Sequence, residues 1–515
     1  MQKSRNTLGT IKRALTILLL ICIVLELCIY GSEEIAFGCF VELFGWLLIS
    51  QTVLKEKFLT THFISFIAIF FYGVSFFVLP IPATMLEGKP LTFRFSVPYL
   101  TFFNLMLNAI TIVCSFHFCR KVYHEGWLSG LWKKLGFFSV PNNRQIWALA
   151  IFGFLALLWG VGQQGTENME AENLGAFGQF LNVARQFAYV PVVFLFDKYW
   201  GCNKNYAGSR RIILFYLVIL ALVAIASTRR TILVNLVFSA LVLTLFFAIY
   251  ENKKLFSAKT TLFLIVGLYL ATGPLADLAM AMIINRASVY NSSSSSTFNN
   301  ILELYSDKER LHTLYQMGTY SNSDNGGDNN ASWSEYYLDN IFLDRFCNLR
   351  TQDITLDYAQ KLGYGSERMK DYAKNFVWFQ VPTPILRAFG YKGNKFENNY
   401  TPGDLLSTDA LGLSQQYIGF RVCGDSAAGL AWMGYWYYPF AFLIYSILFY
   451  FFASMTSYRK GLLVPIPVMV GMTAYATYFN NATGIFKTIA LLLRTGWQNI
   501  VIYCLLMWLI KKIIK

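Results

Sequence analysis

The chain has 515 residues, of which 55% are hydrophobic and only 14% are charged. Soluble domains carry about a quarter charged residues, so this composition argues against a soluble protein. The formal net charge is +14. In a membrane protein such an excess follows from basic residues on the cytoplasmic side, and it gives no reason to expect a nucleic acid partner.

A helix needs about 20 mostly apolar residues to cross a bilayer. The sequence contains about twelve such runs, which predicts an all-α polytopic membrane protein. The basic start and the length of the first run are typical of an uncleaved anchor rather than of a signal peptide. The predicted spans are 14–30, 35–54, 60–80, 97–118, 145–163, 176–196, 211–227, 231–250, 260–283, 427–453, 461–479 and 486–510.

The distribution of basic residues sets the expected orientation. With the amino terminus inside, the inner connections hold 23 Lys and Arg and the short outer loops hold five. Because basic residues collect on the cytoplasmic side, we expect both termini to be cytoplasmic. The chain then divides into nine spans over 1–283, a large extracytoplasmic loop over 284–426, and three spans over 427–515. The loop has 13 Lys and Arg against 16 Asp and Glu, which does not favour nucleic acid binding.

The large loop has a helical pattern in three places. Apolar residues recur at helical spacing over 301–315, with Asn300 as the expected cap, and over 337–349, with Ser334 as the expected cap. A third helix is predicted from Ser366 to Phe379, because the prolines that follow cannot continue it. The polar segments 291–300 and 318–332 are expected to be flexible. We expect the helices to roof a cavity on the outer face of the bundle; the alternative is an independent external domain.

Arginines at the outer side are the first candidates for a binding site. Arg229 and Arg230 lie in an outer turn between two spans, against the positive-inside rule. A guanidinium binds a phosphate with two parallel hydrogen bonds, so an anionic ligand is one explanation. The other is that both side chains extend to lipid headgroups.

Further charged residues occur where charge is costly. Arg345 is spaced from Ile341 and Leu349 so that it lies on the apolar face of its predicted helix, where it is either paired within the fold or directed at a ligand. Arg350 lies close enough to share that role, and Arg387 follows the proline pair. Ionisable residues inside spans often mark a substrate path; here they are Arg185, Glu26, Glu42, Asp277 and Arg494.

General acid or base chemistry has three candidate carriers outside the spans. His312 is the only histidine in the predicted loop, and Glu33 and Glu34 lie in the first outer loop. Each is also consistent with an ordinary solvated residue. Cys347 and Cys423 are the loop's two cysteines and pair only if the compartment is oxidising. No motif for a metal or a redox cofactor is found, so no cofactor is expected.

Several short motifs together resemble one family. They are the outer turn Ala226-Ser-Thr-Arg-Arg-Thr231, the helix with Asp344-Arg-Phe346, the run Val381-Pro-Thr-Pro-Ile-Leu-Arg387 followed by Lys392 and Lys395, and the small and aromatic segment Gly424–Gly434 before the next span. With the many spans, they resemble the Wzy-type polymerases, which join oligosaccharide repeat units into O-antigen or capsule.

The resemblance implies a GT-C-like glycosyltransferase of the bacterial inner membrane, acting at the outer face on undecaprenyl-pyrophosphate-linked oligosaccharide. Arginines would stabilise the diphosphate leaving group without a metal, and Arg229, Arg230, Arg185, Arg350 and Arg387 are the candidates for that binding. Arg345 is a catalytic candidate. Asp425, Glu33 and His312 are candidates for the base that the acceptor hydroxyl needs. The expected partners are the lipid-linked oligosaccharide, membrane lipid and a chain-length regulator.

Two other functions fit the same sequence. An O-antigen ligase or another GT-C lipid-linked glycosyltransferase would share the spans and the arginines. A polysaccharide flippase or transporter would use charges inside spans, such as Arg185 and Asp277, as a substrate path. The transporter is disfavoured because the two halves of the sequence show no internal repeat, a feature that many transporters have.

Overall fold

The computed structural model describes residues 7–122, 126–162, 175–200, 207–226, 230–252, 266, 269, 273–284, 294–321, 336–381, 383–390, 400–412, 421–457, 461–480 and 484–514. Within these ranges the regular elements are helices, and the one β pairing is an isolated bridge between Ser457 and Leu463. The predicted all-α class is therefore confirmed for the described part of the chain.

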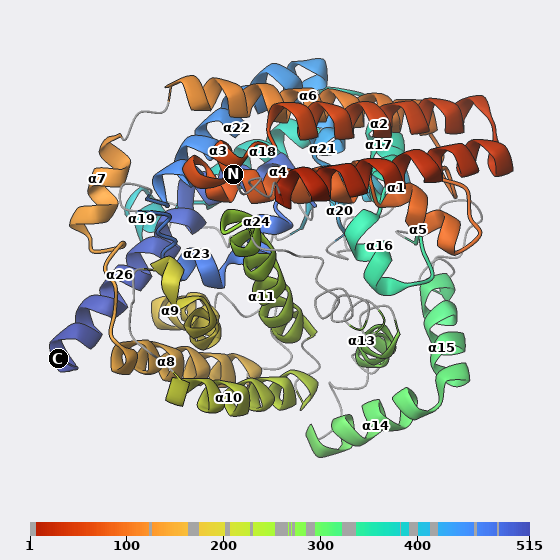
Figure 1. Cartoon of the computed structure of the whole chain (residues 1–515). Helices are drawn as coiled ribbons and strands as arrows, with labels where there is room; N and C mark the ends of the chain where they lie inside the picture. The colour runs from red at the N-terminus through yellow and green to blue at the C-terminus, as the bar shows by residue number, and fades with distance from the viewer. Residues whose placement is uncertain are drawn as a thin grey trace, which may run out of the picture.

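Among the residues that the structure describes, five helical segments are long and apolar enough to cross a membrane, and a bent pair makes a sixth. The prediction of about twelve spans and of a GT-C-like architecture goes beyond this number and stays a prediction. Figure 1 shows α1, α2 and α6 running alongside one another at one edge of the molecule. The five segments are α1 (Thr7–Tyr30), α2 (Glu33–Thr52), α6 (Pro98–Val122), Asp425–Ser454 and Ile485–Ile513.

The bent pair covers the predicted span 60–80. It consists of α4 (Phe63–Phe77) and α5 (Pro80–Leu86), which meet at 43° and follow the short α3 (Glu56–Thr61). Pro80 is the first residue of α5 and has no amide hydrogen to continue the ladder of α4. The bend therefore has a local cause in the sequence.

The middle of the chain forms further helices, of which α8 and α10 are seen at the opposite edge from α1 and α2 in Figure 1. Gly153 of α8 lies directly against the backbone of Phe187 and Ala188 in η1, a 3-10 helix, so a side chain there would collide with main-chain atoms. This close approach makes α8 and η1 a tightly packed pair. The elements are α7 (Trp127–Lys134), α8 (Asn143–Gly162), α9 (Gly175–Ala184), η1 (Arg185–Trp200), α10 (Ala207–Ala226) and α11 (Arg230–Tyr250).

The last three predicted spans are all interrupted. The segment predicted as 427–453 comprises α21 (Asp425–Met433), a 3-10 turn η5 (Gly434–Trp436) and α22 (Tyr437–Ser454). The one predicted as 461–479 contains only α23 (Ile466–Val470) and α24 (Met472–Ala476), so a single continuous helix there was wrong. Gly471 separates these two helices. In the final predicted span, α25 (Ile485–Ala490) leads through the π-helical turn η6 (Leu491–Thr495) into α26 (Gly496–Ile513).

The first part of the predicted loop differs from the sequence-based expectation. Helix α14 (Ser294–Ser306) begins within the serine run that was expected to be flexible, and it places Asn300 inside the helix rather than at its cap. The helical pattern then breaks at Asp307, before α15 (Lys308–Ser321). Both helices contact α13 (Pro274–Ile284), which begins at a proline. The segment 322–335, with Ser334, lies outside the described residues.

The second part of the loop packs on the spans. Helix α17 (Arg350–Leu362) contacts α6 and α21, and α16 (Ile341–Cys347) contacts α4 and α5. Buried residues of these loop helices belong to the same hydrophobic core as the spans. An independent external domain does not fit this shared core. The remaining helices are α18 (Glu367–Phe379), which confirms the predicted third helix, α19 (Thr383–Ala388) and α20 (Pro402–Ala410).

Candidate functional site

A polar pocket lies where α4, α6, α17 and α21 meet, with room for about one water molecule. A pocket with convergent polar groups inside an otherwise apolar bundle is the default candidate for a binding site. Its polar lining is Thr101, Asn104 and Asn108 on α6, Gln352 on α17, and Asp425 and Ser426 on α21; Tyr72, Phe76, Leu105, Leu356 and Phe479 complete it.

Asp425 is the acidic group among these lining residues, and a chain of hydroxyl and amide groups orients it. The Tyr445 hydroxyl donates to Asp425 Oδ2 at 3.2 Å and lies 3.4 Å from the hydroxyl of Tyr437. Tyr437 in turn donates to Asn108 Oδ1 at 3.4 Å, and Asn108 Nδ2 donates to Ser426 Oγ at 2.7 Å. The network ties the first turn of α21 to α22 and α6, so the carboxylate is held in a fixed position.

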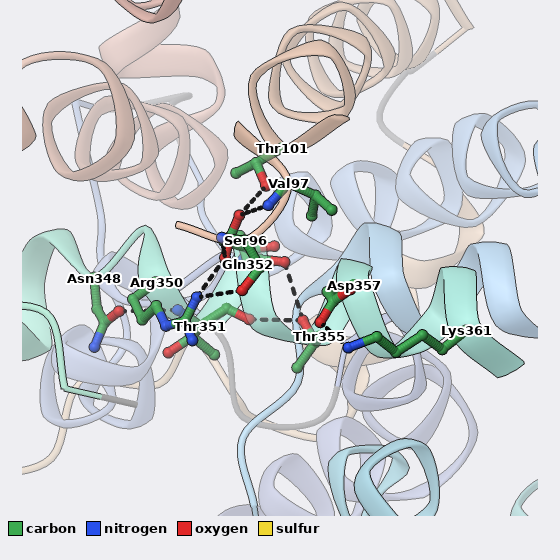
Figure 2. A network of polar contacts seen from close by, with 11 residues as sticks. Ser96, Val97, Thr101, Asn348, Arg350, Thr351, Gln352, Thr355, Asp357 and Lys361 are labelled. Atoms are coloured by element: carbon green, nitrogen blue, oxygen red, sulfur yellow. Dashed lines mark hydrogen bonds and ion pairs between the residues drawn. The ribbon is translucent and has the colours of Figure 1, made fainter. Parts of the chain in front are cut away.

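Helix α17 lines the pocket with Gln352 and Leu356, and Asp353 of the same helix binds the residues that precede α6. Figure 2 shows this junction, with Ser96, Val97 and Thr101 beside Arg350 and Gln352 of α17. The Asp353 carboxylate is fully buried and accepts hydrogen bonds from the backbone amides of Ser96 at 2.7 Å and Val97 at 2.9 Å. These amides precede α6, so Asp353 binds the free amides at the start of that helix. The first turn of α17 therefore carries both Asp353, which anchors the helix, and Gln352, which lines the pocket.

The predicted arginines do not gather at this pocket. Arg350 is an ion-pair partner of Asp353, with Nη1 2.6 Å from Oδ2, so its placement is explained within the fold. Arg185 and Arg387 are exposed at the start of η1 and near the end of α19. Arg229 lies outside the described residues, as does the side chain of Arg230, the first residue of α11.

The expected position of Arg345 was wrong. Its side chain is exposed rather than on the apolar face of a helix. The reason is that α16 ends at Cys347, so Leu349 does not belong to the same helix, and the helix begins after Asn340, whose side chain caps it. Residue spacing predicts which side chains share a helix face only when the residues belong to one continuous helix.

Neither of the other two base candidates lines the pocket. His312 lies in α15, with Nε2 3.6 Å from Oδ1 of Asp277, and the same carboxylate is 3.0 Å from Nζ of Lys308. Glu33 is exposed in the first turn of α2, where a carboxylate favours the helix start. Among the described candidates, Asp425 alone lines the pocket.

The structure also places the two glutamates of the first predicted spans and the two cysteines of the predicted loop. Glu26 and Glu42 are both fully buried, and Glu26 accepts a hydrogen bond from the Leu91 amide at 2.7 Å. Cys347 and Cys423 are buried free thiols and form no disulfide with each other. Across the described residues, no group of three or more His, Cys, Asp or Glu side chains is arranged to hold a metal ion.

Sequence reasoning missed several polar residues of the pocket. Asn104 and Asn108 are one helical turn apart in a predicted span, and this spacing alone would have placed both amides on one face. Gln352 and Tyr445 had no comparable signal, because their importance depends on contacts between distant parts of the chain. Comparisons with known proteins add no further assignment: no family model, curated protein or solved structure matches this chain.

Proposed function

We propose that this protein is a membrane-embedded glycosyltransferase that polymerises undecaprenyl-pyrophosphate-linked oligosaccharide repeat units into a surface polysaccharide. It would act at the outer face of the bacterial inner membrane, with both termini in the cytoplasm. The observation that carries the proposal is the position of Asp425: a carboxylate held by Tyr445 in a polar pocket, at the start of an apolar helical segment and beneath a loop helix.

The reaction assigns Asp425 the role of general base. The acceptor hydroxyl attacks the anomeric carbon of the donor sugar, a new C–O bond forms, and the bond from that carbon to the diphosphate oxygen breaks. Asp425 takes the hydroxyl proton, and the lipid diphosphate leaves with the electron pair of the broken bond. Asn104, Asn108 and Gln352 supply amide groups suited to sugar hydroxyls. Since the pocket has room for about one water molecule, a sugar can enter only if the side chains that line it move apart.

The test is complementation of a gene-deletion strain with wild type, Asp425→Asn or Asp357→Asn. Asp357 lies in α17 and pairs with Lys361 at the surface, so its variant controls for loss of a carboxylate. We expect Asp425→Asn to accumulate in the membrane at wild-type levels but to give surface lipid capped with a single repeat unit. Normal polymer from Asp425→Asn would remove this residue from the mechanism.

The deletion strain itself separates the alternative functions. A polymer ladder retained on the carrier lipid would identify a ligase. Single units stranded on the cytoplasmic side would identify a flippase, and the catalytic role of Asp425 would fall with that result.

A further inference from the structure

Two glutamates of the first two helices are buried without a positive partner. Glu26 of α1 and Glu42 of α2 are both 0% exposed. Glu26 Oε1 accepts a hydrogen bond from the amide of Leu91 at 2.7 Å, whereas Glu26 Oε2 and both carboxyl oxygens of Glu42 have no hydrogen-bond partner among the described residues. The described part of the chain also provides no ion pair for either carboxyl group.

The packing of α1 against α2 brings the two carboxyl groups into one region. Gly38 lies one helical turn before Glu42, so both residues belong to the same face of α2. A Cβ at Gly38 would lie 3.0 Å from Cδ2 of Leu91, and the amide of Leu91 is the group that binds Glu26. The face of α2 that carries Glu42 therefore adjoins the residue that holds Glu26.

The basic residues of the neighbouring helices lie elsewhere. Helices α1, α4 and α6 pack on α2, and α4 contains no Asp, Glu, His, Lys or Arg. The basic residues of α1 and α6 lie in the turns nearest α3: Lys12 donates to the carbonyl of Leu54, and the Arg120 guanidinium lies 5.0 Å from the centre of the Phe58 ring. Helix α2 continues past Glu42 by about 15 Å before it reaches this end.

This environment favours a proton on Glu42. An isolated charge is very costly in an apolar interior, so a buried carboxyl group without a cation takes up a proton. Besides Glu26, the ionisable groups near Glu42 are Cys39, Tyr337 and Cys347, which add no positive charge. A protonated carboxyl group has one O–H donor that needs an acceptor, and Oε2 of Glu26 is a buried oxygen without a donor.

We propose that Glu42 and Glu26 form a proton-binding site in the membrane interior, in which Glu42 carries the proton and donates it to Oε2 of Glu26. The inference does not depend on the proposed function, because neither carboxyl group lines the polar pocket. The site is connected to the large loop, since the Tyr337 hydroxyl donates to the carbonyl of Leu91 at 2.7 Å. Loss of the proton would therefore place two like charges beside the residue that holds Tyr337.

The experiment is infrared spectroscopy of the purified full chain in detergent at neutral pH, where exposed carboxyl groups are ionised. Isotopic labelling of the glutamate side-chain carboxyl separates the bands of Glu from those of buried Asp. Wild type is expected to show the carbonyl band of a protonated Glu, and Glu42→Gln is expected to lose it. The matched control is Glu33→Gln, because Glu33 is exposed in the first turn of the same helix; this variant should keep the band.

Glu26→Gln tests the acceptor. Its carbonyl oxygen can still accept from the Leu91 amide, and its NH₂ group then replaces the oxygen that accepts from Glu42. The band of the protonated Glu is expected to remain but to shift to higher frequency, because the carboxyl group loses a hydrogen bond.

Three results would overturn the inference. A wild-type protein without the band would show that Glu42 is ionised or binds a metal cation, whether or not any variant folds. A band that persists in Glu42→Gln would place the proton on another glutamate. An unshifted band in Glu26→Gln would show that the two carboxyl groups do not share the proton.

Discussion

The Arg350 guanidinium and the Asp353 carboxylate form an ion pair at 2.6 Å inside the junction between α17 and α6. The pair is nearly excluded from solvent, with the Arg350 side chain 12% exposed and that of Asp353 0%. Arg350 Nη1 also donates to Ser96 Oγ at 3.1 Å, so both members of the pair hold the segment that precedes α6. The ion pair therefore anchors α17 to the segment that precedes α6.

Replacement of Asp353 by Ala should therefore be strongly destabilising. It would leave Arg350 buried without its partner and would free two amides at the start of α6, at a cost of roughly 3 kcal/mol. Thermal unfolding of the purified protein in detergent measures the effect. Asp357→Ala, which breaks only the surface pair with Lys361, should cost no more than about 1 kcal/mol. Equal losses in the two variants would contradict this account.

Asp344 should make the stability depend on pH. Burial raises the pKa of this carboxyl to about 6, although the amides of Leu338 and Tyr337 and the charge of Arg345 favour the ionised form. A raised pKa means that the folded state binds the proton more tightly than the unfolded state. The contribution is complete below about pH 4 and is lost as the pH rises through about 6, a change of roughly 2 kcal/mol.

The measurement for Asp344 is unfolding of wild type and Asp344→Asn between pH 4 and pH 7. The Asn variant keeps an oxygen to accept from the two amides but cannot ionise. Wild type should lose stability relative to the variant as the pH rises through this window. A constant difference between the two proteins would show that Asp344 does not titrate there.

Replacement by alanine should have opposite effects at Gly153, which is packed against η1, and at Gly130, which is not packed against another element. Gly153→Ala would place a methyl group 2.3 Å from the Ala188 amide nitrogen, and since main-chain atoms cannot rotate away, we expect a loss of about 1–3 kcal/mol. Gly130 in α7 has no neighbouring atom within 4 Å, and Ala is the better helix former, so Gly130→Ala should gain about 0.5–1 kcal/mol. Thermal unfolding of both variants provides the comparison, and a stable Gly153→Ala would refute the packing.

Asp277 should fix α15 to α13. Its side chain is 9% exposed and meets Lys308 and His312 of α15. In Asp277→Asn the amides of α15 should exchange with solvent several-fold faster, because the buried anchor loses its charge. Glu303→Gln is the control, since its pair with Arg310 is exposed on both sides. Hydrogen exchange followed by mass spectrometry measures both, and unchanged protection of α15 in Asp277→Asn would exclude the anchor.

The sequence predicts the helical class well because an apolar run of bilayer length has few alternatives. The predicted spans over 14–30, 35–54 and 97–118 each fall within α1, α2 and α6 or within two residues of them. Interruptions are less predictable, because a single residue causes each of them: Pro80 breaks the third predicted span, and α21 ends before Gly434, whose φ of +59° favours glycine.

The site was predictable only in part, for a physical reason. Asp425 stands at the start of an apolar run, where a carboxylate is conspicuous. Gln352 and Tyr445 carry no comparable signal, because only the packing of distant segments brings them to Asp425. Arg350 was misread in the opposite way. Its charge suggested that it binds a ligand, but it pairs with Asp353, three residues further along the chain. Both side chains bind the segment that precedes α6, which the sequence does not indicate.

The segment between α5 and α6 has a consequence for how the protein is made. Glu87 accepts from the amides of Asp339 and Asn340, the Leu91 carbonyl accepts from the Tyr337 hydroxyl, and the amides of Ser96 and Val97 donate to Asp353. These partners lie 246 to 257 residues further along the chain. The amino-terminal spans must therefore enter the membrane with this connection unfinished, and the ribosome has to synthesise two thirds of the protein before the first third can reach its final form.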